Sequence, residues 1–147
     1  MTNTRVWIGT GWKMNKTLAE GREYADVLAA ANIPEGVQLF ILPPHTALAA
    51  VRDQLPASSP VLIGAQNAHW APEGSFTVEI SMRMAADAGA TLIEMGHSER
   101  RAMFGETDET VSLKARAALD AGLTPLICVG ESSQVREAGE ELSLIHI

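Results

Sequence analysis

Five short apolar runs are the feature that most constrains how this chain can fold. Longer segments with helical periodicity separate the runs, so strands and helices should alternate. Each run is hydrophobic almost throughout, which is typical of parallel strands that helices cover on both faces. We therefore expect an α/β fold with strands at Val6–Gly9, Val37–Leu42, Val61–Ala65, Thr91–Met95 and Leu123–Val129.

The segments between the runs predict helices with identifiable ends. Thr46 and Ser81 are the expected N-caps, because their hydroxyl groups can accept hydrogen bonds from free backbone N–H groups. Gly89 and Gly122 stand where a helix ends on a left-handed residue. The expected helices are Leu18–Ala31, Thr46–Gln54, Ser81–Ala88 and Thr107–Ala121.

Alternating strands and helices can form an open doubly wound sheet or part of a closed barrel, and periodicity alone does not separate the two. The residues after the first run, Gly9 to Met14, read GTGWKM. A dinucleotide-binding fingerprint requires glycine where Met14 stands, so that fingerprint fails. The Lys-Ser/Thr pair of a phosphate-binding P-loop is absent as well.

Charge and cysteine content exclude several classes of function. With 11 basic and 18 acidic residues the formal net charge is −7, which disfavours a general nucleic-acid or anionic-membrane surface. A single cysteine cannot form an internal disulfide, and no two histidines have metal-binding spacing, so we expect no metal site. The apolar run at Val6–Ile8 is too short for a signal peptide or a membrane span. We therefore expect a cytoplasmic protein.

Ligands of α/β folds gather at the carboxyl ends of the strands, which draws attention to Lys13 and His97. Lys13 follows the first run and suits a phosphate or a developing oxyanion; a solvated lysine is the alternative. His97 precedes a short helix that Ser98 could cap, and the positive end of that helix favours a neutral imidazole. Such a ring can donate a hydrogen bond to a substrate carbonyl, although it could equally be a structural histidine.

Other polar residues carry less information. His45 and His69 fall in loops. Cys128 lies inside the predicted fifth strand with no adjacent base, so we expect a buried packing thiol rather than a nucleophile. Glu131 follows that strand, either as a helix-starting carboxylate or as a partner of a site residue.

Four motifs occur in an order that resembles the triosephosphate isomerase family, with a match that extends over about residues 5–141. The resemblance implies a (β/α)8 barrel of which this chain holds the first five βα units. It also implies cofactor-free interconversion of dihydroxyacetone phosphate and glyceraldehyde 3-phosphate through an enediolate. The motifs are GTGWKMNK at residues 9–16, GAQN at 64–67, GHSERR at 96–101 and CVGE at 128–131.

The resemblance also implies roles for individual residues. Lys13 corresponds to the lysine that binds the substrate and stabilises negative charge, and His97 corresponds to the electrophile. Glu99 corresponds to the supporting glutamate beside that lysine. The segment from Gln66 to Glu79 resembles the loop that the family inserts into a second subunit, which implies a homodimer. In that loop the resemblance selects Gln66, Asn67, Thr77 and Glu79 as dimer-contact positions.

Two positions depart from the family pattern. Gly11 stands where the family usually has an asparagine that donates to the substrate, and Val78 stands where glycine is usual. The GTGWKMNK opening resembles the branch that isomerises tetrulose phosphates such as erythrulose phosphate. Because glycine lacks a side chain, Gly11 could admit one more substrate carbon. An erythrulose phosphate isomerase is therefore the alternative to a triosephosphate isomerase.

The number of βα units leads to a further expectation. A complete barrel needs about 250 residues and eight units, so residues 1–141 should form only the N-terminal part of one domain. Leu142–Ile147 matches a translated sequencing-adapter end, so we expect these six residues, including His146, to be non-native. The family's glutamate base belongs to a later unit, which predicts an inactive chain. A non-catalytic phosphate-binding half-barrel is the alternative from another class.

Overall fold

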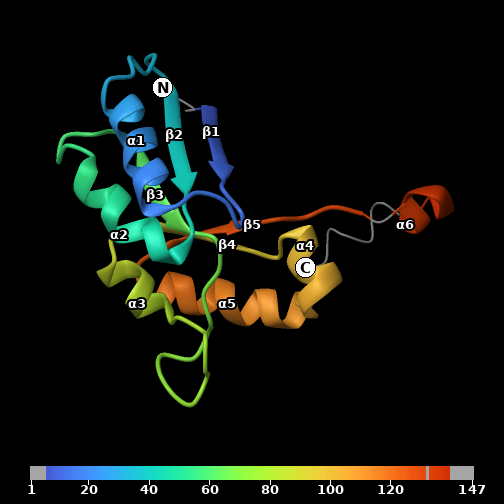
Figure 1. Ribbon diagram of the computed structural model, residues 1–147. Helices are drawn as coiled ribbons and strands as arrows, with labels where there is room; N and C mark the ends of the chain where they lie inside the picture. The colour runs from blue at the N-terminus through green and yellow to red at the C-terminus, as the bar shows by residue number, and fades with distance from the viewer. Residues whose placement is uncertain (1–5, 132, 140–147) are drawn as a thin grey trace.

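The computed structural model describes residues 6–131 and 133–139, which form five parallel βα units arranged as a half-barrel (Figure 1). The strands pair in sequence order, and every pair is parallel. They are β1 (Val6–Gly11), β2 (Val37–Leu42), β3 (Leu62–Ala65), β4 (Leu92–Met95) and β5 (Thr124–Ile127). The helices are α1 (Leu18–Ala29), α2 (His45–Gln54), α3 (Met82–Asp87), α4 (Ser98–Phe104), α5 (Asp108–Asp120) and α6 (Ser133–Ala138).

The predicted order of strands is confirmed, with the largest shifts at the ends of β1 and β5. β1 continues to Gly11, because its ladder with β2 extends as far as Leu42. β5 ends at Ile127, so Cys128 and Val129 follow the strand, contrary to the sequence prediction. The partner strand explains this, because β4 ends at Met95 and Gly96 turns the chain away with a φ of +74°.

The predicted helix ends at Gly89 and Gly122 are confirmed, as is the cap at Ser81, whereas the predicted cap at Thr46 is wrong. The Ser81 hydroxyl accepts from the Met84 N–H, as expected of an N-cap. Gly89 and Gly122 have left-handed φ values of +101° and +73°. Thr46 does not cap α2.

α2 begins one residue earlier than predicted, at His45, with Pro44 as its N-cap. The proline ring fixes φ at −55°, and no side-chain hydrogen bond caps the first turn. Thr46 therefore lies inside that turn.

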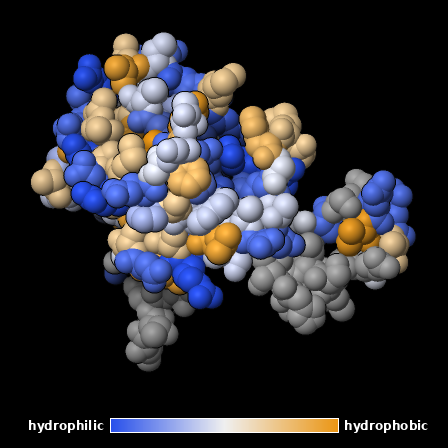
Figure 2. All heavy atoms as spheres, turned by 90° about the horizontal axis from the view of Figure 1, so that it is seen from below, coloured by the Kyte–Doolittle hydropathy of each residue, from blue (hydrophilic) through white to orange (hydrophobic). Residues whose placement is uncertain are grey.

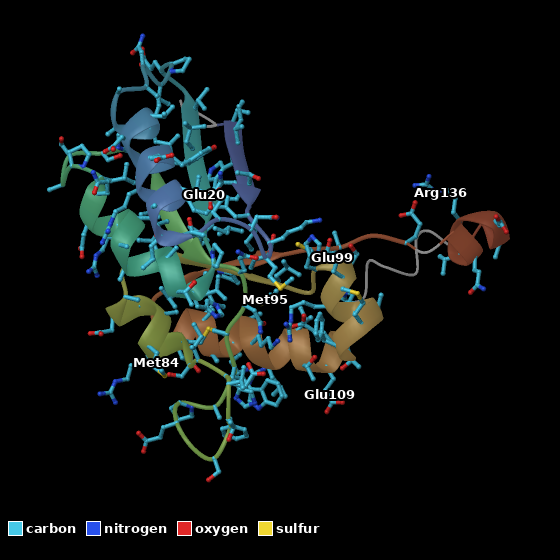
Figure 3. The ribbon with its side chains drawn as sticks, in the orientation of Figure 1. Glu20, Met84, Met95, Glu99, Glu109 and Arg136 are labelled. Carbon is cyan, nitrogen blue, oxygen red and sulfur yellow. The ribbon has the colours of Figure 1, made fainter. Side chains whose placement is uncertain are left out.

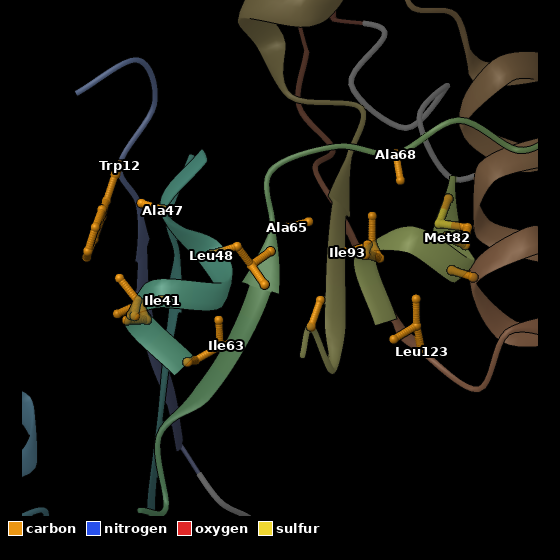
Figure 4. Packing of buried hydrophobic residues seen from close by; sticks show 14 of the residues in the cluster. Trp12, Ile41, Ala47, Leu48, Ile63, Ala65, Ala68, Met82, Ile93 and Leu123 are labelled. Carbon is orange, nitrogen blue, oxygen red and sulfur yellow. The ribbon is translucent and has the colours of Figure 1, made fainter. Parts of the chain in front are cut away.

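Alternation along the strands separates two apolar layers. One layer lies between the sheet and its helices, where Ile41, Ile63 and Ile93 pack against α2, α3 and α5 (Figure 4). The other lies on the concave inner face, where Leu42 and Leu92 are fully buried. A Cβ at Gly64 would lie 2.6 Å from side-chain atoms of both leucines, so glycine is required for that close packing.

β1 is covered poorly among the described residues. It pairs only with β2, and Val6, Trp7 and Ile8 are 60%, 48% and 52% exposed. Successive strand residues point to opposite faces, so both faces of β1 are open. The face of the molecule seen in Figure 2 has no such continuous apolar strand, because its apolar side chains are scattered among polar ones. No helix in the described part of the chain is long and apolar enough to cross a bilayer.

A polypeptide of these 147 residues, expressed alone, should self-associate through β1. A strand with unpaired backbone groups and exposed apolar side chains is a template for edge-to-edge pairing. Light scattering of the purified chain should therefore show species larger than a monomer.

Replacing both Trp7 and Ile8 by lysine should reduce this association, because charged side chains oppose strand pairing. The matched control places two lysines at Val27 and Leu119, which are exposed on helices. A monodisperse monomer, or equal improvement by both lysine pairs, would show that β1 does not drive association.

Candidate active site

The carboxyl ends of β1 and β4 bring Lys13 and Glu99 together, although 86 positions separate them in the sequence. The Lys13 Nζ donates to the Glu99 Oε1 over 2.5 Å. Figure 3 shows Glu99 at the start of α4, beside the segment that leaves β1. Both side chains are about half exposed, so the pair borders an open space at the strand ends.

Lys13 has a left-handed backbone, with φ at +55°. That conformation costs energy for a residue with a Cβ and persists only where surrounding contacts impose it. Here the Trp12 N–H donates to the Leu42 carbonyl over 3.0 Å, and the Gln66 side chain donates to the Lys13 carbonyl over 3.0 Å. The buried Trp12 ring also packs edge-on against Tyr24. These contacts hold the backbone of Lys13 in the conformation from which its side chain reaches Glu99.

His97 caps α4, which corrects the prediction that Ser98 would do so. The His97 Nδ1 accepts the Glu99 N–H over 3.2 Å, whereas Ser98 is already the first helical residue. Imidazole can replace a hydroxyl group as a cap because its unprotonated nitrogen is a good acceptor. Since Nδ1 accepts, the ring proton lies on Nε2. His97 therefore presents a neutral ring with an N–H donor.

Glu99 holds both of these groups. The hydrogen bond from Lys13 keeps the pKa of the Glu99 carboxyl below its ordinary value of 4.5. Its other oxygen lies 3.7 Å from the His97 Nδ1. The glutamate therefore stays ionised and positions the lysine ammonium near the imidazole.

Glu94 is a site residue that the sequence analysis missed. It lies on the inner face of β4, three residues before His97, and is half-buried. Burial raises the pKa of its carboxyl above its ordinary value of 4.5, while the positive charge of Lys13 opposes that rise. The sequence did contain a signal for this residue, namely an acidic side chain inside the apolar run Leu92–Met95. Burying a carboxyl group without a strong partner costs free energy, so such a residue needs an explanation.

Gly11 lies across the inner face from Glu94. A Cβ built on Gly11 would lie 3.6 Å from the Glu94 Oε2 and 3.8 Å from the Leu42 Cδ1. One methyl group therefore fits there in ordinary van der Waals contact. A longer side chain would have to share that space with the carboxyl group.

Cys128 differs from its prediction, since it lies after β5 and is only partly buried. Its Sγ is a hydrogen-bond donor to the Glu94 Oε1 over 3.7 Å. Burial, followed by the negative charge of Glu94, raises the pKa of the thiol from 9.0 to about 11. The thiol is thus protonated at neutral pH and is a poor nucleophile.

The segment from Gln66 to Glu79 projects from the end of β3 (Figure 1). Its base is fixed, because the buried Asn67 accepts from the Lys114 Nζ over 2.8 Å. Thr77 and Glu79 are exposed in its second half. Val78 is 93% exposed with φ at +83°, a conformation that favours glycine and is strained for a β-branched residue.

The remaining candidates lie outside this group. His45 and His69 are hydrogen-bonded to backbone groups, at Asn67 O and Ala71 N. Glu131 pairs with Arg136 on α6. His146 and the proposed tail at 142–147 lie outside the described residues. In the part of the chain that the structure describes, no cluster of His, Cys, Asp or Glu could hold a metal ion.

The fold and site together define a (β/α) barrel with an ammonium group and a neutral imidazole at its strand ends. The triosephosphate isomerase family model matches residues 6–146. The chain belongs to the triosephosphate isomerase family.

Two curated relatives of this chain have the same name. A protein from Mycolicibacterium smegmatis named L-erythrulose-1-phosphate isomerase is 57% identical over 96% of this chain and 55% of its own length. Another with that name, from Rhizobium meliloti, is 52% identical over 95% and 55%. A crystal structure of triosephosphate isomerase from Bartonella henselae matches with a TM-score of 0.87 and 38% identity, over 96% of this chain and 58% of that one. The chain thus spans about half the length of these relatives.

Cys128 should react slowly with iodoacetamide at pH 8, because only the thiolate attacks. A pKa of about 11 instead of 9.0 lowers the thiolate fraction at that pH, and hence the rate, about 100-fold. Mass spectrometry of the Cys128 peptide over a pH series measures the rate. Glu94→Gln should move the midpoint to lower pH, because it removes a negative charge. A fast reaction at pH 8 would contradict the assigned environment.

Proposed function

We propose that the barrel to which these five βα units belong is an L-erythrulose-1-phosphate isomerase. The observation that carries this proposal is the 57% identity to the Mycolicibacterium smegmatis protein of that name. Gly11 supports it, because the glycine replaces the asparagine usual in the family and leaves room beside Leu42 for a longer substrate. L-erythrulose 1-phosphate thus replaces triose phosphate, the first candidate from the sequence, as the proposed substrate.

The described residues can supply the electrophilic half of an isomerisation. The Lys13 ammonium and the His97 Nε2–H would both donate to the substrate carbonyl oxygen. When a base removes the proton from the neighbouring carbon, the electron pair forms the carbon–carbon double bond and negative charge develops on that oxygen. Fixed donors stabilise such charge without reorganising. The family resemblance assigns the glutamate base to a later βα unit.

The proposal extends to the assembly and location of the protein. The projecting segment between Gln66 and Glu79 supports a homodimer, because its exposed tip would insert into a second subunit. We propose a cytoplasmic protein that acts on a small phosphorylated sugar without a cofactor.

Triosephosphate isomerase activity is the second candidate. The Bartonella henselae structure supports it through its 38% identity and close backbone match. Lys13, His97 and Glu99 would serve either substrate equally. Discrimination therefore depends on residues around the substrate's far end, beginning with Gly11.

The experiment uses a chimera in which residues 1–131 of this chain precede the remaining C-terminal part of the Mycolicibacterium smegmatis relative. Its kcat/KM should be higher with L-erythrulose 1-phosphate than with dihydroxyacetone phosphate. Lys13→Met and His97→Gln should each lower kcat at least 100-fold, because each removes a donor to the developing oxyanion. Circular dichroism provides the folding control. Preference for the three-carbon substrate would overturn the proposed substrate.

Gly11→Asn in the same chimera should move selectivity towards dihydroxyacetone phosphate. The asparagine would occupy the space beside Leu42, so we expect the kcat/KM ratio of the two substrates to change about 10-fold or more. Gly11→Ala is the matched control, because its Cβ fits in ordinary contact. Unchanged selectivity in the asparagine variant would show that Gly11 does not determine substrate length.

A further inference from the structure

The Glu94 carboxyl has an oxygen available to a ligand. Oε1 accepts from the Cys128 thiol, which is a weak donor. Oε2 accepts no hydrogen bond from any residue that the structure describes. A half-buried carboxyl served by one weak donor contributes little to stability. Its position on an otherwise leucine-lined face therefore favours a binding role.

Oε2 faces the space that Gly11 leaves open. A Cβ at Gly11 would approach Oε2 to 3.6 Å and Oε1 to 3.9 Å, so both oxygens border this space. Leu42 forms another side, with its Cδ1 at 3.8 Å from the same point. The space is thus apolar except for one acceptor, and it suits a carbon that carries a hydroxyl group.

The same space lies beside the electrophilic pair, because Lys13 follows Gly11 by two residues at the end of β1. The positive charge of Lys13 also acts on the Glu94 carboxyl. His97 also follows Glu94 by three residues across the end of β4. A substrate whose carbonyl meets Lys13 and His97 can therefore direct its other end towards Glu94.

We propose that Glu94 is a substrate-binding residue that selects four-carbon ketose phosphates by accepting a hydrogen bond from a hydroxyl group at the substrate's far end. This inference rests on the proposed function. L-erythrulose 1-phosphate has one CHOH unit more than dihydroxyacetone phosphate, and so one more hydroxyl group. Gly11 provides the room, and Glu94 provides the acceptor. The three-carbon substrate is too short to fill the space and leaves Oε2 without its partner.

Glu94→Gln in the chimera tests this role. It should lower kcat/KM for L-erythrulose 1-phosphate about 10- to 100-fold, since a hydrogen bond to a charged group is weakened. For dihydroxyacetone phosphate, kcat/KM should change less than about threefold. Glu94→Asp keeps the charge but shortens the side chain, and should retain more four-carbon selectivity than Glu94→Leu. Glu109→Gln, at an exposed position on α5, is the matched control.

The outcomes separate the two proposals. If the unmodified chimera isomerises only dihydroxyacetone phosphate, the proposed function is overturned and the role of Glu94 with it. If the chimera prefers the four-carbon substrate but Glu94→Gln lowers both reactions equally, only the selectivity role is overturned, and a base or structural role takes its place. The pH midpoint of Cys128 alkylation in Glu94→Gln shows independently that the thiol remains beside position 94.

Discussion

Parallel pairing of consecutive strands is the constraint on which the rest of this structure depends. Because every strand runs in the same direction, the segments after β1 and β4 emerge at one edge of the sheet. The curvature of the half-barrel then brings Gly11 opposite Glu94 across its inner face. The ion pair between Lys13 and Glu99 is a product of the same geometry. The start of α4 adds His97, which caps the helix, and Glu99, which lies in its first turn.

The inner face combines two opposing electrostatic effects. Burial favours the protonated form of Glu94, whereas the positive charge of Lys13 favours the ionised form. The adjacent Cys128 responds to the same carboxyl, and the pKa of its thiol rises to about 11. A positively charged donor group therefore lies near a half-buried acceptor beside Leu42. The donor and the acceptor can bind opposite ends of a small phosphorylated sugar and so fix its orientation.

Local patterns predicted much of this architecture, and they failed where the cause was not local. The run Val37–Leu42 became β2 with unchanged ends, because it is paired along its whole length. The predicted strand Leu123–Val129 was too long, since its apolar composition continues beyond the end of its partner β4. The caps at Thr46 and Ser98 were wrong because Pro44 and His97 begin the helices instead. The preference of a residue type for the N-cap position does not show at which residue the helix begins.

The amino-acid sequence by itself determined the alternation of strands and helices, the family motifs and the chemical groups at the strand ends. Lys13, His97, Glu99 and Gly11 were all identified from those motifs. Only the tertiary structure decided that Gly11 faces Glu94, that the His97 Nδ1 accepts the Glu99 N–H, and that the Cys128 thiol lies beside Glu94. The physical reason is that periodicity and motifs report interactions between near neighbours in the chain. The position of Gly11 on β1 opposite the Glu94 carboxyl on β4 depends on the curvature of the sheet. No local sequence pattern encodes that curvature.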